Sequence, residues 1–364
     1  MKILYIGRYN KSEELTGPEK VAKRIFSLAS KENETAFLEY YFDGSKYGIN
    51  QKLFGYENVS PDIDLKVYRM GLFRILTFLF KFKPDVIHII TFERFSVIAY
   101  FYKIFSKVKI VYNVHGVAVY ENANFKNVSS SLNFKDSFCE KIFMKQSNLL
   151  LFLSEHQLSI ARKYYELKKE KIKFINNGID EEFNNKKLLQ TVIPSLVFIG
   201  DSDRKDKDFN FLYSNLNKLN HECNLFVVGK FSNTLYKTKV GNVTIITVDK
   251  MNRDALVNYL LDKNIFISSS FYDTFSIAAA ECMSLGLVPI LTDTTGISKL
   301  IRNGENGFVI NYGDGVSLAD KINFLLENQD LWRTMSQKAS EIYDVLNWNT
   351  VYIDYQNIYK VFSK

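Results

Sequence analysis

The chain has 364 residues, of which 46% are hydrophobic and 24% are charged. This composition is typical of a soluble globular protein, and the length exceeds that of one ordinary domain, so we expect two domains. The apolar run Leu72–Phe82 is interrupted by Arg74 and Lys81, which excludes a membrane-spanning segment there. The net charge of +7 is moderate and comes without a dense basic run, so nucleic-acid binding is not expected.

The start of the chain and its cysteines indicate a cytoplasmic protein. Met1–Gly7 lacks the long apolar core of a signal peptide and instead predicts a first β-strand. The three cysteines, Cys139, Cys223 and Cys282, are scattered along the chain. They form neither a disulfide framework nor a cluster of metal ligands, and we expect a cytoplasmic location.

Short apolar strands alternate with helical segments along almost the whole chain, which predicts parallel sheets with crossover helices. Doubly wound domains of this kind bind ligands at the carboxyl ends of their strands, so the expected site is a cleft between the two domains. The polar segment Asp180–Pro194 is the expected linker. The strands expected in the first half are Lys2–Ile6, Val86–Ile90, Lys109–Asn113, Leu149–Leu153 and Ile172–Ile175. Those expected in the second half are Leu196–Gly200, Leu225–Val228, Val243–Thr247, Ile265–Ser268, Val288–Leu291 and Phe308–Ile310.

Two segments of the first half, residues 68–83 and 94–107, mix bulky aromatic side chains with lysine and arginine. Helices of this composition can lie in a membrane interface, with their cations directed toward anionic head groups. The alternative is that both are core helices of an α/β domain with a basic exposed edge. An anionic membrane surface is therefore a candidate partner.

Two acids flank a predicted helix start in the second half. An apolar strand leads into small polar residues and then into an alanine-rich helix, with Asp273 just before the helix and Glu281 two turns into it. Carboxylates accept paired hydrogen bonds from sugar diols. The alternative is an ordinary capped helix of an α/β fold, because two acids eight residues apart are common by chance.

The same helix start predicts an anion site. The backbone N–H groups of Phe275, Ser276 and Ile277 are expected to point outward there, where the helix dipole favours a phosphate. A phosphate at the helix start, with one carboxylate beside it and one beneath it, would be a cradle for a nucleotide-sugar.

The spacing Asp273-x7-Glu281 resembles the E-x7-E signature of glycosyltransferase family 4, with Asp in place of the first Glu. The continuation over residues 281–290 resembles the family's Glu-Ala-Met-Ala…Gly-x-Pro-Val pattern, and the resemblance extends over nearly the whole chain. It implies an α/β GT-B fold of two Rossmann-like, doubly wound domains facing a central cleft. Residues 1–185 would form the acceptor domain and residues 186–347 the donor domain. The final helix, 348–364, carries an aromatic stripe suited to packing back on the first domain.

Two motifs of the first half resemble contacts that the family makes to its donor. Tyr112–Gly116 places His115 at the end of a predicted strand, and in similar enzymes this imidazole approaches the transferred sugar and the phosphates. Family members carry a Gly-Gly pair at the place of Gly17, so that the backbone can approach the donor and the acceptor, and Gly17 keeps this freedom. The alternatives are a capped core histidine and a plain helix start. His88, in a weakly specific Pro-Asp-Val-x-His motif, is interpreted as structural.

The start of the second half resembles the family's Gly-Arg…Lys-Gly cations, which bind the donor diphosphate. Lys207 resembles the family lysine, and Arg204 or Lys205 would supply the second positive charge. Two cations over a leaving diphosphate stabilise its developing charge as a metal does elsewhere. Asp208 stands where the family has glycine, so the family motif could also align with this chain at a position shifted by two residues. The alternative is a solvated charged loop.

Two further strings are not expected to take part in the chemistry. Residues 201–203 form an Asp-x-Asp, the metal signature of the other large glycosyltransferase fold, but the neighbouring cations make a metal unnecessary. Residues 177–183 resemble the family's Asn-Gly-Val-Asp-x-x-Phe string, and Asp180 is interpreted as architectural.

The resemblance implies a retaining, metal-independent glycosyltransferase that uses a nucleoside-diphosphate sugar, with UDP the expected nucleotide and no cofactor. Glu281 would bind the ribose hydroxyls, and Asp273 would face the transferred sugar. His115, Asp273 and Lys207 form the expected catalytic set, and the leaving phosphate would help to deprotonate the acceptor. The expected acceptor is a surface polysaccharide or a lipid-linked glycan, and the enzyme would be cytoplasmic, with peripheral membrane contact. A nucleotide-sugar epimerase of the same fold and a non-catalytic partner-binding protein are the alternatives.

Overall fold

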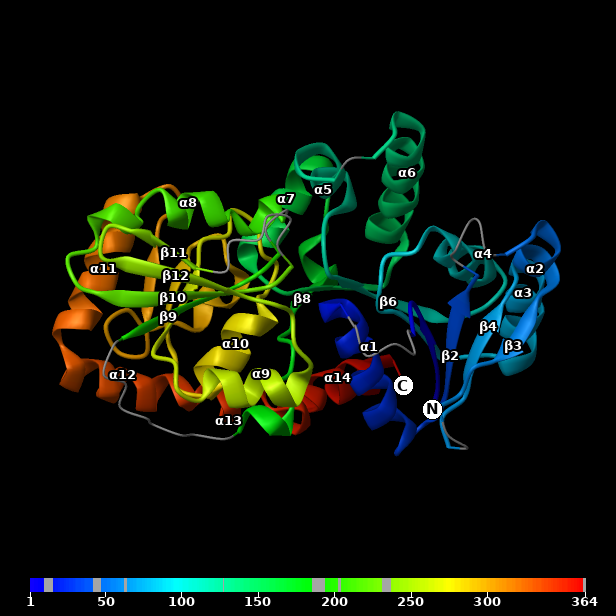
Figure 1. Cartoon of the computed structure of the whole chain (residues 1–364). Coiled ribbons are helices and arrows are strands. Elements are labelled where there is room, and N and C mark those ends of the chain that lie inside the picture. Colours follow the sequence, from blue (N-terminus) through cyan, green and yellow to red (C-terminus); the bar gives the residue numbers. More distant parts are fainter. Residues whose placement is uncertain are drawn as a thin grey trace. The chain divides into compact units, whose positions relative to one another are not determined.

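The structure is a computed structural model of the chain. It describes residues 1–9, 16–41, 47–61, 64–126, 128–184, 194–201, 204–230 and 237–362. The chain divides into two compact units, Met1–Ile175 with Val351–Lys364, and Asn176–Thr350 (Figure 1). The sequence placed the boundary between residues 185 and 186. Residues 185–193 of the predicted linker lie outside the described residues.

The described part of the first unit contains an eight-stranded sheet in the order β3-β4-β2-β1-β5-β6-β7-β8. Neighbouring strands are parallel, except that β3 runs antiparallel to β4. Consequently the carboxyl ends of the parallel strands meet at one edge of the sheet and their amino ends at the other. The strands are β1 (Lys2–Ile6), β2 (Glu34–Tyr40), β3 (Tyr56–Asn58), β4 (Val67–Met70), β5 (Val86–Ile89), β6 (Lys109–Val114), β7 (Leu149–Phe152) and β8 (Ile172–Phe174).

The central strands of this sheet are almost continuous apolar runs, because helices cover both faces of a parallel sheet. β5 is buried at every position, and β1 is buried after its first residue. The helices of the unit are α1 (Gly17–Ser30), α2 (Ile49–Phe54), α3 (Leu72–Phe82), α4 (Val97–Ile104), α5 (Ala118–Asn124), α6 (Ser130–Gln146), α7 (Glu155–Tyr164) and α14 (Trp348–Phe362), the last grouping with this unit from Val351 onward.

A chain of buried hydrogen bonds ties α14 to the sheet. Tyr5 Oη donates to Tyr359 Oη at 3.0 Å, and Tyr359 Oη lies 2.7 Å from His88 Nδ1. His88 Nε2 lies 2.9 Å from Asn113 Oδ1, and Asn113 Nδ2 donates to Tyr355 Oη at 3.1 Å. Since the amide oxygen can only accept, His88 Nε2 carries the proton and Nδ1 accepts from Tyr359. His88 is therefore structural, and Tyr355 and Tyr359 of the aromatic stripe pack on the first unit as predicted.

The second unit contains a seven-stranded sheet among its described residues, in the order β11-β12-β10-β9-β13-β14-β15. Its strands are parallel apart from β11, which runs antiparallel to β12. The strands are β9 (Ser195–Ile199), β10 (Cys223–Val228), β11 (Lys237–Val240), β12 (Val243–Val248), β13 (Ile265–Ser268), β14 (Val288–Thr292) and β15 (Phe308–Ile310). The helices are α8 (Phe209–Tyr213), α9 (Arg253–Leu260), α10 (Ile277–Ser284), α11 (Gly315–Glu327), α12 (Gln329–Ser340) and α13 (Ile342–Leu346).

Each predicted strand is present within one or two residues, but the sequence missed β2, β3, β4 and β11. β2 was hidden by its charge, because a buried strand is not expected to carry Glu39. In the structure Arg69 of β4 donates to Glu39 Oε2 from Nη2 at 2.8 Å and from Nε at 3.1 Å. This pair, made across neighbouring strands, allows a carboxylate to lie almost fully buried in the sheet. The three cysteines are free thiols.

We predict that His88 makes stability depend on pH. Burial lowers the pKa of His88 from 6.5 to about 4. Between these two pH values the imidazole is therefore protonated in the unfolded chain and neutral in the folded chain. The free energy of unfolding therefore falls as the pH falls through this window, by roughly 2 kcal/mol between pH 7 and pH 5. Urea denaturation at both pH values should show this extra loss in the wild type relative to His88→Gln. Equal losses in the two proteins would show that folded His88 titrates normally.

Candidate functional site

The turn that follows β9 holds the predicted cations in a defined geometry. It contains the short helical turn Lys205–Lys207 and then Asp208, which adopts a left-handed conformation with φ of 43°. Asp208 Oδ1 caps the next helix by accepting from Phe211 N at 3.1 Å, and Oδ2 accepts from Tyr312 Oη at 2.5 Å. A left-handed position is one that glycine favours, so Asp208 fits the place of the family glycine without a shift of the alignment. This backbone geometry supports the predicted assignment of Lys207 to the family lysine.

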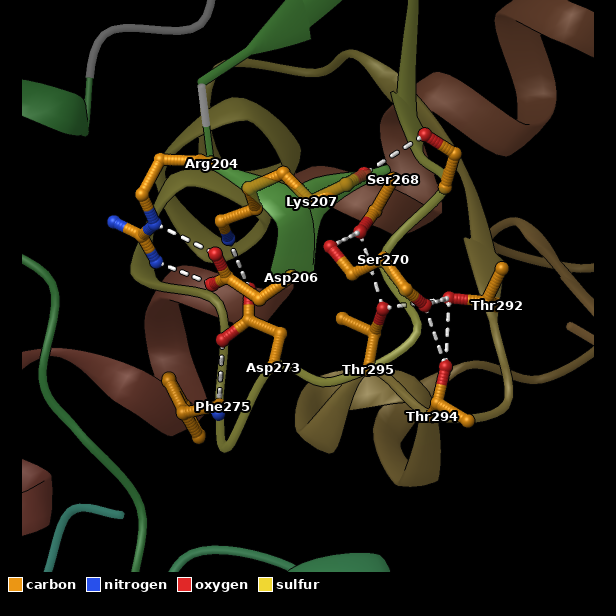
Figure 2. A network of polar contacts seen from close by, with 11 residues as sticks. Arg204, Asp206, Lys207, Ser268, Ser270, Asp273, Phe275, Thr292, Thr294 and Thr295 are labelled. Atoms are coloured by element: carbon orange, nitrogen blue, oxygen red, sulfur yellow. Dashed lines mark hydrogen bonds and ion pairs between the residues drawn. The ribbon is translucent and has the colours of Figure 1, made fainter. Parts of the chain in front are cut away.

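Lys207 meets Asp273 at the centre of this site (Figure 2). Lys207 Nζ lies 2.5 Å from Asp273 Oδ2, and both side chains are mostly buried. Burial raises the pKa of Asp273, but the Lys207 ammonium and hydrogen bonds from Ser276 and Phe275 N outweigh it and hold that pKa below its ordinary value. The two predicted residues thus form one charged pair at the carboxyl ends of β9 and β13.

Backbone contacts fasten the two loops that carry this pair. Ser269 Oγ donates to the carbonyl oxygens of Lys207 and Asp208 at 3.1 and 2.9 Å. Phe271 N donates to Asp206 O at 3.1 Å. These contacts position Lys207 relative to Asp273 and were not visible in the sequence, because they join segments about sixty residues apart.

Arg204 is held by a residue that the sequence analysis did not single out. Its Nε donates to Asp206 Oδ1 at 2.7 Å, and its Nη2 contacts Asp206 Oδ2 in a two-pronged pair (Figure 2). Asp206 is buried, whereas the Arg204 side chain is 54% exposed. Asp206 therefore presents Arg204 in a fixed orientation. Lys205 is exposed on the same turn.

The predicted outward direction of the Phe275 N–H group is wrong. Phe275 N donates to Asp273 Oδ1 at 3.3 Å, because an aspartate side chain readily accepts from the backbone two residues ahead. Ser276 follows in a left-handed conformation with φ of 73° and precedes the first residue of α10, Ile277. The helix start lies beside the Lys207–Asp273 pair, as the sequence predicted, but one of its donors is used internally.

A cluster of hydroxyl groups lies beside the Lys207–Asp273 pair and supports the loop that carries Asp273 (Figure 2). Ser268 Oγ lies 3.1 Å from both Ser270 Oγ and Thr295 Oγ1, while Thr292 and Thr294 each donate to Ser270 O at 2.6 Å. The neighbouring Gly296 N donates to Asp273 O at 2.8 Å. The loop after β14 therefore pins the residue whose carboxylate pairs with Lys207.

Glu281 lies in a second charged group, on α10. Its side chain is nearly buried, and Arg253 Nη2 lies 3.1 Å from Glu281 Oε1 and 2.6 Å from Asp180 Oδ2. The guanidinium also stacks over the Phe183 ring, 5.0 Å from its centroid. Asp180, interpreted from the sequence as architectural, thus shares a cation with the acid expected to bind ribose. Arg253 lies 28 residues before Glu281 in the chain and carried no sequence signal.

His115 and Gly17 belong to the first unit. His115 directly follows β6 and is half-buried, and its Nε2 has no hydrogen-bond partner among the described residues. Burial, reinforced by His88, lowers the pKa of His115 to about 3, so the imidazole is neutral near pH 7. Gly17 is the first residue of α1, where Thr16 N donates to Glu19 Oε2 at 2.9 Å.

These groups can bind an anion next to a polyol. Lys207, Arg204 and the start of α10 supply positive charge, and the carboxylates supply hydrogen-bond acceptors. Within the described ranges, no group of three or more histidine, cysteine, aspartate and glutamate side chains could hold a metal ion. Ser202 and Asp203 of the Asp-x-Asp string lie outside those ranges.

Two family models match adjacent parts of the chain. The model described as Glycosyltransferase Family 4 matches residues 41–183, and the one described as Glycosyl transferases group 1 matches residues 180–342. The second match contains Lys207, Asp273 and Glu281 and thus the whole charged site of the second unit.

Two relatives are similar to large parts of the chain, and a solved structure shares its fold. N-acetyl-alpha-D-glucosaminyl L-malate synthase of Bacillus anthracis is 23% identical over 294 residues, which are 76% of this chain and 74% of that protein. The capsular polysaccharide biosynthesis glycosyltransferase CapM of Staphylococcus aureus is 24% identical over 209 residues, which are 54% of this chain and 52% of CapM. The structure of HepE from Anabaena in complex with UDP-glucose superposes with a TM-score of 0.71 at 16% identity, covering 100% of this chain and 99% of HepE.

We predict that Gly296→Ala disturbs the site. A Cβ atom at Gly296 would lie 2.0 Å from Thr274 O and 2.9 Å from Phe275 Cα, so the loop that carries Asp273 must move. Such overpacking costs roughly 1–3 kcal/mol of stability, measurable by thermal denaturation. Gly48→Ala is the control, because a Cβ there meets no atom within 4 Å. Equal melting temperatures for wild type and Gly296→Ala would contradict the tight packing of this loop.

Proposed function

The chain belongs to glycosyltransferase family 4 and has the GT-B fold, and on this basis we propose that it transfers a sugar from a UDP-sugar donor with retention of anomeric configuration. The Lys207–Asp273 pair carries the proposal. It places a cation and a carboxylate side by side, next to the start of a helix and at the carboxyl ends of parallel strands. At this place the cation can bind the diphosphate of a nucleotide-sugar donor and the carboxylate can accept hydrogen bonds from its sugar hydroxyls.

We assign separate parts of the donor to the residues of the second unit. Lys207 and the half-exposed Arg204 bind the diphosphate, helped by Lys205 and by the start of α10 at Ser276 and Ile277. Asp273 faces the hydroxyls of the transferred sugar, and Glu281 accepts from the ribose. Charge-assisted hydrogen bonds of this kind contribute about 1.5–3 kcal/mol each. HepE, whose structure contains UDP-glucose, supports the choice of a UDP-sugar.

The proposed chemistry needs no metal ion. As the bond to the sugar breaks, negative charge develops on the departing phosphate, and the fixed cations stabilise it. The same phosphate takes the proton of the attacking acceptor hydroxyl on the front face. His115 and Gly17 contribute from the first unit, where a neutral imidazole donates a hydrogen bond to the donor and the glycine lets the backbone approach.

We propose a surface polysaccharide or a lipid-linked glycan as the acceptor, and a cytoplasmic enzyme in peripheral contact with an anionic membrane surface. CapM, a relative named for capsular polysaccharide biosynthesis, supports this acceptor class. Among the described residues, no helix is both long enough and apolar enough to cross a bilayer.

A nucleotide screen tests the donor. In thermal-shift and calorimetric titrations with UDP, GDP and their common sugars, we expect stabilisation by UDP compounds that persists in EDTA. Lys207→Ala should weaken UDP binding at least about tenfold, or roughly 1.4 kcal/mol, because it removes the buried cation at the diphosphate. Lys239→Ala, which removes an exposed lysine of the same unit, is the control.

The outcomes of this screen separate the alternatives. If no nucleotide stabilises the protein, the proposal that it binds a nucleotide-sugar donor is wrong, and the non-catalytic alternative is favoured. If a sugar nucleotide is converted without an acceptor, the epimerase alternative is favoured. Loss of binding in EDTA would overturn the metal-independent mechanism.

The two acids should respond differently to substitution. Asp273→Asn should weaken UDP-sugar binding about tenfold while UDP itself binds at least as tightly, because the carboxylate faces the sugar and Lys207 loses its internal partner. Glu281→Ala should weaken UDP and UDP-sugar alike, because both contain the ribose. Calorimetry on the same two ligands measures both ratios. Equal effects of Asp273→Asn on UDP and UDP-sugar would contradict its assignment to the sugar.

A further inference from the structure

The amino-end edge of the first unit's sheet is strongly basic. β5, β6, β7 and β8 run parallel, so their amino ends lie together, at the edge opposite His115. Lysines from four chain segments meet there. Lys83 precedes β5, Lys109 begins β6, Lys145 lies in the last turn of α6 before β7, and Lys171 directly precedes β8. The sequence contains no dense basic run, so only the parallel sheet gathers these cations.

Two hollows follow this edge. The first, of about 780 Å³, is lined by Phe80, Phe105 and four lysines, namely Lys83, Lys103, Lys107 and Lys109. The one acid among its lining residues, Asp85, accepts a hydrogen bond from Lys2 N at 2.7 Å. The second hollow, of about 610 Å³, is lined by a further four lysines, Lys141, Lys145, Lys168 and Lys171, with Glu166 the one acid among its lining residues.

The end of α6 joins the two hollows into one surface. Lys103 Nζ donates to Gln146 O at 2.7 Å, and Lys171 Nζ donates to Lys145 O at 3.1 Å. Both ammonium groups therefore sit at the negative end of the same helix dipole, which stabilises them. Burial lowers the pKa of Lys103, and repulsion from Lys171 and Lys109 adds to this. The cations are close enough to repel one another, so the surface favours a polyanionic partner.

Large apolar side chains protrude from the same surface. Ile104 ends α4 and is 73% exposed, Phe105 follows it at 62%, and Phe101 one turn earlier is 48% exposed. A soluble polyanion would leave these side chains in water. A bilayer interface accepts them among its acyl chains while its head groups meet the lysines.

We propose that this basic edge, formed by the eight lysines of the two hollows with Ile104 and Phe105, docks on a lipid bilayer that contains anionic head groups. The inference deepens the proposed peripheral location by naming the face that makes the contact. It extends the sequence-based expectation of two interfacial helices. Lys83, Lys103 and Lys107, with Ile104 and Phe105, lie in the two segments that the sequence singled out, whereas the other five lysines come from the start of β6, from α6 and from the turn before β8. Docking at the amino ends leaves the carboxyl-end edge of the same sheet, with His115, uncovered.

Vesicle sedimentation tests the proposal on the full chain. We expect binding to vesicles of phosphatidylcholine with phosphatidylglycerol, little binding to phosphatidylcholine alone, and release at high salt. The triple variant Lys107→Glu, Lys109→Glu, Lys168→Glu should lower partitioning at least about tenfold, because each residue contributes electrostatic attraction near the surface. These three lysines are exposed, so the variant should keep its melting temperature.

Matched variants separate the face from the overall charge. Lys218→Glu, Lys237→Glu, Lys239→Glu changes the net charge equally on the second unit and should bind vesicles like the wild type. The double variant Ile104→Ser, Phe105→Ser should lower partitioning onto vesicles at low and high salt alike, because it removes apolar contact and not charge. The double variant Val316→Ser, Val345→Ser, at exposed apolar residues of the second unit, should partition like the wild type.

Three results would overturn the proposal: absence of wild-type binding to anionic vesicles, an equal loss in the two lysine triples, or full displacement of the wild type by soluble polyphosphate with no effect of Ile104→Ser and Phe105→Ser. The UDP-induced thermal shift is measured on the same samples. If it persists while vesicle binding fails, the membrane face is wrong and the donor proposal stands. If the UDP-induced thermal shift is absent while the protein binds vesicles, the donor proposal is wrong and the membrane face stands.

Discussion

Burial of parallel strands on both faces is the constraint from which the rest of this structure follows. Strands such as β5 and β13 lie wholly inside, so their interiors admit few polar side chains and charge concentrates at the strand ends. In the second unit the carboxyl ends carry the Lys207–Asp273 pair. In the first unit the amino ends carry the basic edge. Both charged surfaces follow from the exclusion of charge from buried strand interiors, one at the carboxyl ends of the second unit's sheet and the other at the amino ends of the first unit's sheet.

The site in the second unit is held in place before any ligand binds. Asp208 and Ser276 adopt left-handed conformations that cost free energy for residues with a Cβ atom, and both form side-chain hydrogen bonds that offset this cost. Gly296 packs against the backbone of the Asp273 loop, where a side chain has no room. A charged pair fixed in this way needs little reorganisation to stabilise charge that develops beside it, as the proposed mechanism requires.

Two histidines of the first unit, His88 and His115, differ in their hydrogen bonding. His88 and His115 both lie in or just after parallel strands, and burial lowers the pKa of each. His88 uses both ring nitrogens within the fold, through Tyr359 and Asn113. His115 Nε2 is buried without a hydrogen-bond partner among the described residues. A buried polar atom without a hydrogen-bond partner is costly, and this observation supports the proposed hydrogen bond from His115 to the donor.

The strand–helix alternation, eleven of the described strands and the packing of the last helix could be predicted from the sequence, because they depend on local apolar patterning. Spacing within single segments was enough to propose Lys207, Asp273 and Glu281 as site residues. The sequence could not predict β2, since a buried Glu39 is acceptable only beside Arg69 from another strand. The sequence analysis expected the Phe275 N–H group to point toward a ligand, whereas in the structure it donates to the Asp273 carboxylate. The position of Arg253 beside Glu281, and the addition of lysines from β6, α6 and the turn before β8 to the basic edge, likewise became visible only in the folded structure. Each involves partners far apart in the chain, and their interaction energy exists only once the sheet has brought them together.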